Sequence, residues 1–365
     1  MVDGLDHRGD PGGGVKAYDP FPRGRHPAGV RTLRALDAER SRLFPCEIWY
    51  PADSRHAGED LDPERQDAFI VPFDRTRRRQ AAVRDAASRP GTYPLVLFSH
   101  STGGDRRQSS FLCTHLASRG NIVAALDHSE TFVAELGRRS GETGEQRSAR
   151  WKAVMASRVP DVRFLLDFLL PSEWDPRVDI DADRIAVAGH SLGGWTALAL
   201  PDADERIRAV VAMAPAGASN PRPGVLPAKL AFAWGRDVPA LFLVAENDTS
   251  MPLAGMHELF SRTPETKRMI VLRRSDHMHF MDGVEARHEG FRTMPLSGEL
   301  AALQKEMRPM AELTSGDRAH LFVRGLVLAH LDDALDLRDD APRFWTGDVE
   351  GELSRRGVEI AVHRA

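Results

Sequence analysis

From Pro94 onward the sequence alternates short apolar runs with helix-like stretches, and this alternation constrains the fold more than any other feature. The runs are almost uninterrupted by polar residues, which is typical of strands buried on both faces of a parallel sheet. They cover residues 95–98, 122–126, 185–188, 207–213, 240–245 and 269–272. The helix-like stretches lie near residues 107–119, 158–170, 192–200 and 253–262. The pattern predicts an α/β protein with a doubly wound, mostly parallel sheet and helices on both faces.

The sequence before this alternation has a different character. Residues 1–28 are rich in Gly and Pro and are expected to form a flexible tail. Residues 30–36 and 44–50 alternate with a period of about two, which predicts two antiparallel strands at the entry to the sheet. We therefore expect a single domain over residues 29–365.

Several further segments complete this organisation. Polar stretches near 53–92 and 136–157 interrupt the pattern and are expected to be insertions, which either shape a substrate cleft or form solvated surface loops. An amphipathic stretch at 318–331 predicts a late helix. Residues 358–362 form either an edge strand or a frayed end.

One apolar run ends in the motif Gly189-His-Ser-Leu-Gly193, and a helix-like run follows it. Glycine at both ends of the motif avoids Cβ clashes in a sharp reversal, and this leaves the hydroxyl of Ser191 projecting from the turn. Pro201 is expected to stop the helix. Such a motif alone arises by chance in many chains, but the strand before it and the helix after it are those of a nucleophile elbow. Ser191 is therefore the predicted nucleophile.

A serine hydroxyl needs a nearby base, and that base needs a carboxylate to orient it. Asp248 follows the apolar run 240–245, and Glu246 is the rival acid. The base is expected after the run 269–272, where His277 is the candidate and His279 its rival.

Attack on a carbonyl also requires two N–H donors for the oxyanion that forms. The N–H of Leu192, directly after the nucleophile, is one expected donor. The other is expected from the turn 99–104, whose glycines would let the backbone approach a substrate closely. The alternative is that this segment is a simple turn between a strand and a helix.

Four segments carry a resemblance to a known family, and they are residues 29–52, 94–104, 116–128 and 183–194. They resemble the α/β-hydrolase superfamily, in particular its dienelactone-hydrolase-like and platelet-activating-factor acetylhydrolase-like serine esterases. The resemblance implies an α/β-hydrolase fold and a nucleophile, acid and histidine in the chain order Ser191, Asp248, His277.

The same resemblance bears on individual residues. In the acetylhydrolase-like group the catalytic histidine is followed by phenylalanine three residues later and then by an acid, which favours His277, with Phe280 and Asp282. It also places the second oxyanion donor at the N–H of Thr102. The family usually has glycine where this chain has Ser101, so the loop must either suit a residue with a side chain or be slightly strained.

Two further differences from the family concern the acid and the nucleophile. Animal acetylhydrolases carry their acid after the strand that follows the elbow. Here residues 211–215, which end that strand, contain no carboxylate, and this favours Asp248, the dienelactone-hydrolase-like position. Dienelactone hydrolases use a cysteine nucleophile, whereas this chain has Ser191.

The predicted function is cleavage of a carboxylic ester through an acyl-enzyme on Ser191. A lactone, thioester or amide substrate, or a non-catalytic binding module of the same fold, are the alternatives. No cofactor and no metal are expected, because the sequence has neither a phosphate-binding fingerprint nor a supported zinc motif. The net charge of −4 indicates no nucleic-acid partner.

The remaining expectations concern location and redox state. No stretch approaches the roughly 18 apolar residues of a membrane span, and the N-terminus is too polar for a signal peptide, so a cytoplasmic location is expected. Cys46 and Cys113 are expected to be reduced core residues, although a single disulfide between them is possible.

Overall fold

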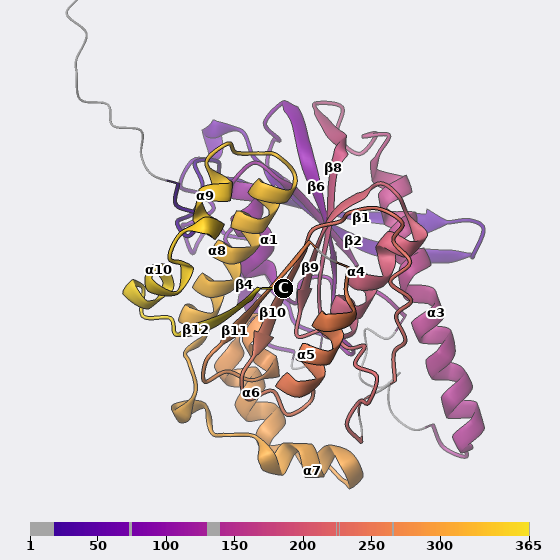
Figure 1. Cartoon of the computed structure of the whole chain (residues 1–365). Coiled ribbons are helices and arrows are strands. Elements are labelled where there is room, and N and C mark those ends of the chain that lie inside the picture. The colour runs from indigo at the N-terminus through magenta and orange to yellow at the C-terminus, as the bar shows by residue number, and fades with distance from the viewer. Residues whose placement is uncertain are drawn as a thin grey trace, which may run out of the picture.

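The computed structural model describes residues 18–72, 75–129, 139–223, 225, 227–264 and 266–364. A 10-stranded sheet crosses the molecule in the order β12-β11-β10-β9-β8-β6-β7-β2-β1-β5 (Figure 1). The six predicted apolar runs lie in β6 (Gly91–Ser99), β7 (Ile122–Leu126), β8 (Val178–His190), β9 (Ile207–Met213), β10 (Ala240–Ala245) and β11 (Lys267–Leu272). These strands pair in parallel throughout. The predicted doubly wound, mostly parallel sheet is confirmed.

Antiparallel strands complete the two sides of the sheet. β1 (Ala28–Asp37) and β2 (Arg42–Pro51) pair along their whole length, and β2 joins β7 antiparallel. The short β5 (Val83–Arg84), in contrast, pairs with β1 in parallel. At the opposite side β12 (Ile360–Arg364) pairs antiparallel with β11, so the apolar run near the C-terminus is an edge strand.

Helices cover both faces of the sheet (Figure 1). One face carries α3 (Gly144–Leu169), α4 (Leu192–Ala203) and α5 (Leu253–Arg262), whose apolar residues form one core cluster. The other face carries α1 (Ser110–Ser118), α8 (Gly316–Ala334), α9 (Ala341–Thr346) and α10 (Val349–Arg355). Alternate residues of β10 enter the two clusters, with Phe242 in the first and Leu243 in the second. This explains why the run reads as continuously apolar.

The remaining elements are shorter. α6 (Val284–Thr293) and α7 (Gly298–Glu306) follow the turn η2 (His277–Phe280), and η3 (Met310–Glu312) precedes α8. No helix of the described ranges is long and apolar enough to cross a membrane. Cys46 and Cys113 are both free and buried, as expected of reduced core residues.

The two predicted insertions differ from the expectation. The first, 53–92, holds η1 (Ser54–His56), the hairpin of β3 (Ala68–Ile70) and β4 (Arg77–Arg79), and β5. Residues 136–138 of the second, 136–157, lie outside the described residues, and most of the rest is the first half of α3 rather than an irregular loop. The helix begins at a capping box in which Thr143 and Gln146 satisfy each other's backbone N–H. This capping pair is the signal that the sequence analysis missed.

Helix α4 also differs in its end, because it continues past Pro201 to Ala203. Proline removes a single hydrogen bond here, in the last turn, where little of the helix remains to be disrupted. The carbonyl of Pro201 accepts a hydrogen bond of 3.0 Å from Arg236. The helix ends at Ala203, and Asp204 is its C-cap.

The expected flexible tail is only partly within the described residues, because 1–17 lie outside them. Residues 18–27 are packed, in contrast to the expectation. Phe21 is 5% exposed and lies so close to Gly325 of α8 that a Cβ there would overlap its ring. Tyr18 donates a hydrogen bond of 2.8 Å to Asp332. Two aromatic side chains, which the Gly and Pro content of the tail obscured, anchor this segment.

The turn between β8 and α4 depends on close backbone contacts. A Cβ at Gly189 would overlap the carbonyl of Gly193, and a Cβ at Gly193 would overlap the carbonyl of Ser99 at the end of β6. The first turn of α4 therefore touches the end of the neighbouring strand directly, and only glycine permits that contact.

Phe21→Ala is expected to lower the free energy of unfolding by about 3 kcal/mol, since it empties a buried site between the N-terminal segment and α8. Chemical denaturation of both proteins measures the difference. Leu36→Ala is the control, because Leu36 is 63% exposed, and its effect should stay within about 0.5 kcal/mol. An equally small effect of Phe21→Ala would contradict the packing of this segment.

Gly193→Ala is expected to cost about 3 kcal/mol of stability, because the added methyl group overlaps backbone that cannot yield without moving α4 from β6. Gly290→Ala in α6 is the matched control, since nothing lies within 4 Å of a Cβ at that position. That change should stabilise the protein by up to about 1 kcal/mol. Similar denaturation midpoints for the two variants would show that the contact does not constrain the turn.

Candidate active site

Ser191 occupies the turn between β8 and α4 with strained backbone. Its φ of 58° and ψ of −117° lie outside the regions that residues with a side chain ordinarily adopt. Two elements hold this conformation. The N–H of Ser191 donates to the carbonyl of Met213 at 2.9 Å, and its own carbonyl accepts from Trp195 and Ala216, each at 3.0 Å. The strain is thus fixed by the end of β9 and the first turn of α4.

Asp248 and His277 follow β10 and β11, which are adjacent parallel strands. Nδ1 of His277 donates to Oδ2 of Asp248 at 2.7 Å. The other carboxylate oxygen of Asp248 accepts from the N–H groups of Ser250 and Met251, at 2.9 and 2.8 Å. Because the Nδ1 proton is committed to Asp248, the lone pair of this imidazole lies on Nε2. The arrangement can accept a proton at Nε2.

His190 connects this pair to the elbow. Its ring packs against the ring of His277, with centroids 4.6 Å apart, and it directly precedes Ser191 in the chain. No hydrogen bond joins Oγ of Ser191 to Nε2 of His277 within the described structure. In enzymes without substrate this contact is often long and shortens when substrate binds.

The two rival residues have other partners. Glu246 accepts hydrogen bonds from the side chain of Arg273 at 2.6 Å and the N–H of Arg274 at 2.8 Å, so it stabilises the turn after β11. His279 is fully buried. Its Nε2 donates to the carbonyl of Thr314 at 2.9 Å, and its Nδ1 accepts from the N–H of Asp276 at 3.0 Å. Burial lowers the pKa of His279 to about 4. Neither rival is available for proton transfer at the elbow.

Asp276, beside His277, is a second buried carboxylate at this site. One of its oxygens accepts from the N–H of His277, and the other lies 3.9 Å from Nδ1 of His288. Burial, together with the charge of Asp248, raises the pKa of Asp276 to about 6. Burial lowers the pKa of His277, but the charge of Asp248, their hydrogen bond and the charge of Asp276 outweigh that effect and raise it overall. Asp276 therefore contributes to the basicity of His277.

The loop after β6 is held by Gln108, which the sequence analysis missed. Oε1 of Gln108 accepts from the N–H of Ser101 at 2.9 Å and from its hydroxyl at 2.6 Å. Nε2 of Gln108 donates to Nδ1 of His190 at 3.1 Å, so one side chain links this loop to the elbow. Ser101 is not among the residues with positive φ, and a side chain causes no strain there. The N–H of Thr102 has no hydrogen-bond partner within the described residues.

The loop that carries His277 is attached to the same region. Asp282 accepts hydrogen bonds from the N–H of Ser110 at 2.7 Å and of Phe111 at 3.2 Å, so it caps the N-terminus of α1 from a distant part of the chain. Its own N–H donates to the carbonyl of Gln108 at 2.8 Å. The acid that follows Phe280 in the sequence thus fixes the His277 loop to α1.

A second Ser–His–Asp set lies beneath the loop. Oγ of Ser99 is 3.1 Å from Nε2 of His128, and Nδ1 of His128 is 2.9 Å from Asp161. Ser99 and Asp161 are fully buried, and the Ser99 hydroxyl also accepts a hydrogen bond from Arg158 at 3.3 Å. A nucleophile needs access to substrate, so this set does not form an active site.

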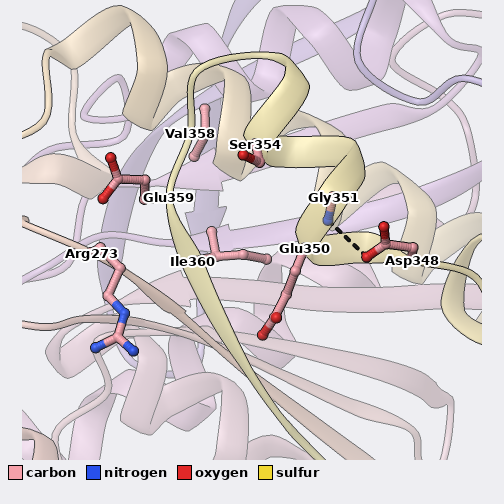
Figure 2. Close-up of a pocket in the computed structure, with 8 residues that line it drawn as sticks. All are labelled: Arg273, Asp348, Glu350, Gly351, Ser354, Val358, Glu359 and Ile360. Carbon is pink, nitrogen blue, oxygen red and sulfur yellow. Dashed lines mark hydrogen bonds between the residues drawn. The ribbon is translucent and has the colours of Figure 1, made fainter.

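Figure 2 shows a surface depression formed by α10 and the start of β12. It contains no predicted site residue and no serine paired with a histidine. Its lining residues are Arg273, Asp348, Glu350, Gly351, Ser354, Val358, Glu359 and Ile360.

Comparison with known proteins agrees with the fold. Residues 68–147 match the family model described as platelet-activating factor acetylhydrolase, isoform II. The platelet-activating factor acetylhydrolase of Bos taurus is 27% identical over 298 residues, which are 71% of this chain and 61% of the relative. A cutinase of Thermobifida alba is 25% identical over 197 residues, covering 53% of this chain and 55% of the cutinase.

A solved structure extends the comparison to nearly the whole chain. The ferulic acid esterase from Streptomyces cinnamoneus superposes with a TM-score of 0.59 and 27% identity, covering 87% of this chain and 92% of the esterase. The sheet order, the strained turn at Ser191 and this superposition all support the same fold. The chain has the α/β-hydrolase fold, and it is similar to serine esterases of the platelet-activating-factor acetylhydrolase kind.

Proposed function

We propose that this protein is a serine hydrolase that cleaves a carboxylic ester, with Ser191 as nucleophile, His277 as base and Asp248 as the acid that orients it. The observation that carries the proposal is the 2.7 Å bond between Asp248 and His277 at the ends of adjacent strands. His190 brings the His277 ring against the turn that presents Ser191. Each residue then has the chemical environment that its role requires.

The reaction follows from these roles. Oγ of Ser191 attacks the ester carbonyl carbon while its proton passes to Nε2 of His277. The N–H groups of Thr102 and Leu192 stabilise the oxyanion that forms. When the bond to the alcohol breaks, the imidazolium returns the proton to the leaving oxygen. Water then loses a proton to Nε2 of His277 and attacks the carbonyl carbon of the acyl-enzyme. The bond between that carbon and Oγ of Ser191 breaks, the imidazolium returns its proton to Oγ, and the carboxylic acid leaves.

The names of the relatives support an ester as the substrate, since they are an acetylhydrolase, a cutinase and a ferulic acid esterase. The chain spans 61% of the length of the bovine acetylhydrolase, so that relative's activity is not transferred as a whole. The acid after β10 supports the dienelactone-hydrolase-like arrangement. A cytoplasmic location and the lack of a nucleic-acid partner stay predictions from the sequence.

Ser191→Ala is expected to lower kcat/KM for short-chain p-nitrophenyl esters by at least about 10⁴-fold, because no other hydroxyl replaces the nucleophile. Ser99→Ala is the matched control, since Ser99 belongs to the buried Ser–His–Asp set. Its kcat/KM should fall by less than about tenfold. Full activity of Ser191→Ala, or loss of activity only in Ser99→Ala, would refute the assignment.

Asp276→Asn is expected to move the acid limb of the pH profile of kcat/KM to lower pH. The Asp276 charge raises the pKa of His277, so its removal lets His277 become the neutral base at a lower pH. The amide oxygen of the introduced asparagine can still accept the hydrogen bond from the N–H of His277. Asp339→Asn, in the exposed segment between α8 and α9, removes the same charge far from the site and should leave the limb in place. If the acid limb of the Asp276→Asn profile did not move, the charge of Asp276 would not raise the pKa of His277.

A further inference from the structure

Arg158 lies behind the loop that follows β6 and is fully buried. It comes from α3, on the opposite side of the loop from Gln108. Its guanidinium donates to the carbonyl of His100 at 2.6 Å and to the carbonyl of Ser101 at 3.3 Å. Nδ1 of His100 also donates to the carbonyl of Ser101, at 2.7 Å. Arg158 thus contacts two consecutive carbonyls of the loop, the second of which also accepts from the N–H of Gly104 at 3.0 Å.

The direction of the N–H groups follows from these bonds. In a trans peptide the C=O and N–H point in opposite directions, and no cis peptide bond occurs in the described chain. The carbonyls of His100 and Ser101 point to Arg158, so the N–H groups of Ser101 and Thr102 point away from it. The N–H of Ser101 meets Gln108, which is bonded to His190 of the elbow. The N–H side of the loop therefore faces the elbow.

Arg158 is a buried positive charge, and the groups that stabilise this charge also fix the orientation of the N–H groups of the loop. A buried guanidinium requires hydrogen-bond acceptors and a counter-charge. Asp161, one turn further along α3, is a buried carboxylate whose charge interacts with that of Arg158, and Arg40, Arg42 and His128 contact it at 2.6, 2.7 and 2.9 Å. Burial keeps the pKa of His100 well below its ordinary value, so His100 is neutral and can donate from Nδ1 while Nε2 accepts from His128.

We propose that Arg158 is a positioning residue for the oxyanion site, because it fixes the peptide between Ser101 and Thr102 so that the Thr102 N–H faces the substrate oxygen. This inference rests on the proposed function and adds a residue from α3 to it. Arg158 touches no substrate. It acts on the transition state through the peptide, so its removal affects kcat rather than substrate binding.

The test is Arg158→Lys, which keeps the charge but loses the two-pronged donor geometry. We expect kcat to fall about 10²-fold while KM changes less than about threefold. Affinity for a trifluoromethyl ketone, which forms a tetrahedral oxyanion adduct with the serine, should fall by a similar factor. Affinity for the matching methyl ketone, which stays trigonal, should change little. A role in stability alone would not separate the two inhibitors.

Arg163→Lys is the matched control, because Arg163 lies on the same helix with its side chain 48% exposed and an ion pair to Asp204. It should keep kcat within about twofold. The proposal would be overturned if the kcat of Arg158→Lys, and the ratio of its affinities for the trifluoromethyl and methyl ketones, both stayed within threefold of the wild-type values.

Arg158→Met tests the same point without the charge and should lose about 10³-fold in kcat. If Arg158→Met does not fold, Arg158→Lys decides. If neither variant folds, Arg158 serves stability and the proposal is overturned. Failure of the proposed function would be recognised separately, because Ser191→Ala would then keep its activity, regardless of the kcat of Arg158→Lys.

Discussion

The contact between the first turn of α4 and the end of β6 is the constraint on which the rest of the site depends. Gly193 lies against the carbonyl of Ser99 with no room for a Cβ. This contact sets the distance between the strained serine and the loop that begins at His100. The loop N–H groups can face the elbow only because the two backbones approach so closely, and Gln108 then joins them through Ser101 and His190.

Hydrogen bonds between distant segments complete the site. The His277 loop is bound to α1 through Asp282, and the loop after β6 is bound to α3 through Arg158. The strand ends bring Ser191, Asp248 and His277 to one edge of the sheet, as expected for a doubly wound fold. The orientation of the groups, however, comes from side chains outside the sheet, with Arg158 on α3 and Gln108 and Asp282 in turns.

Much of this was predictable from the sequence. The apolar runs identified the parallel strands because both faces of each are buried, and the glycines at 189 and 193 identified the turn because only they fit it. Asp248 and His277 could be proposed because each follows a strand. Arg158 and Gln108 could not. Arg158 bonds backbone carbonyls 57 and 58 residues away, and Gln108 joins the nearby Ser101 to His190, which is 82 residues away. The start of α3 was missed because its capping pair stands in a polar stretch, and Phe21 because a Gly- and Pro-rich context resembles a loose tail.

The proposed function requires that the Ser191 hydroxyl is a nucleophile activated by His277. Incubation with a fluorophosphonate, followed by mass spectrometry of the digested protein, tests it most directly. We predict one phosphonyl adduct per chain, located on the peptide that contains Ser191, and labelling that slows at least about 10²-fold in His277→Asn. An adduct on a different serine, or labelling of Ser191 at an undiminished rate in His277→Asn, would contradict the account.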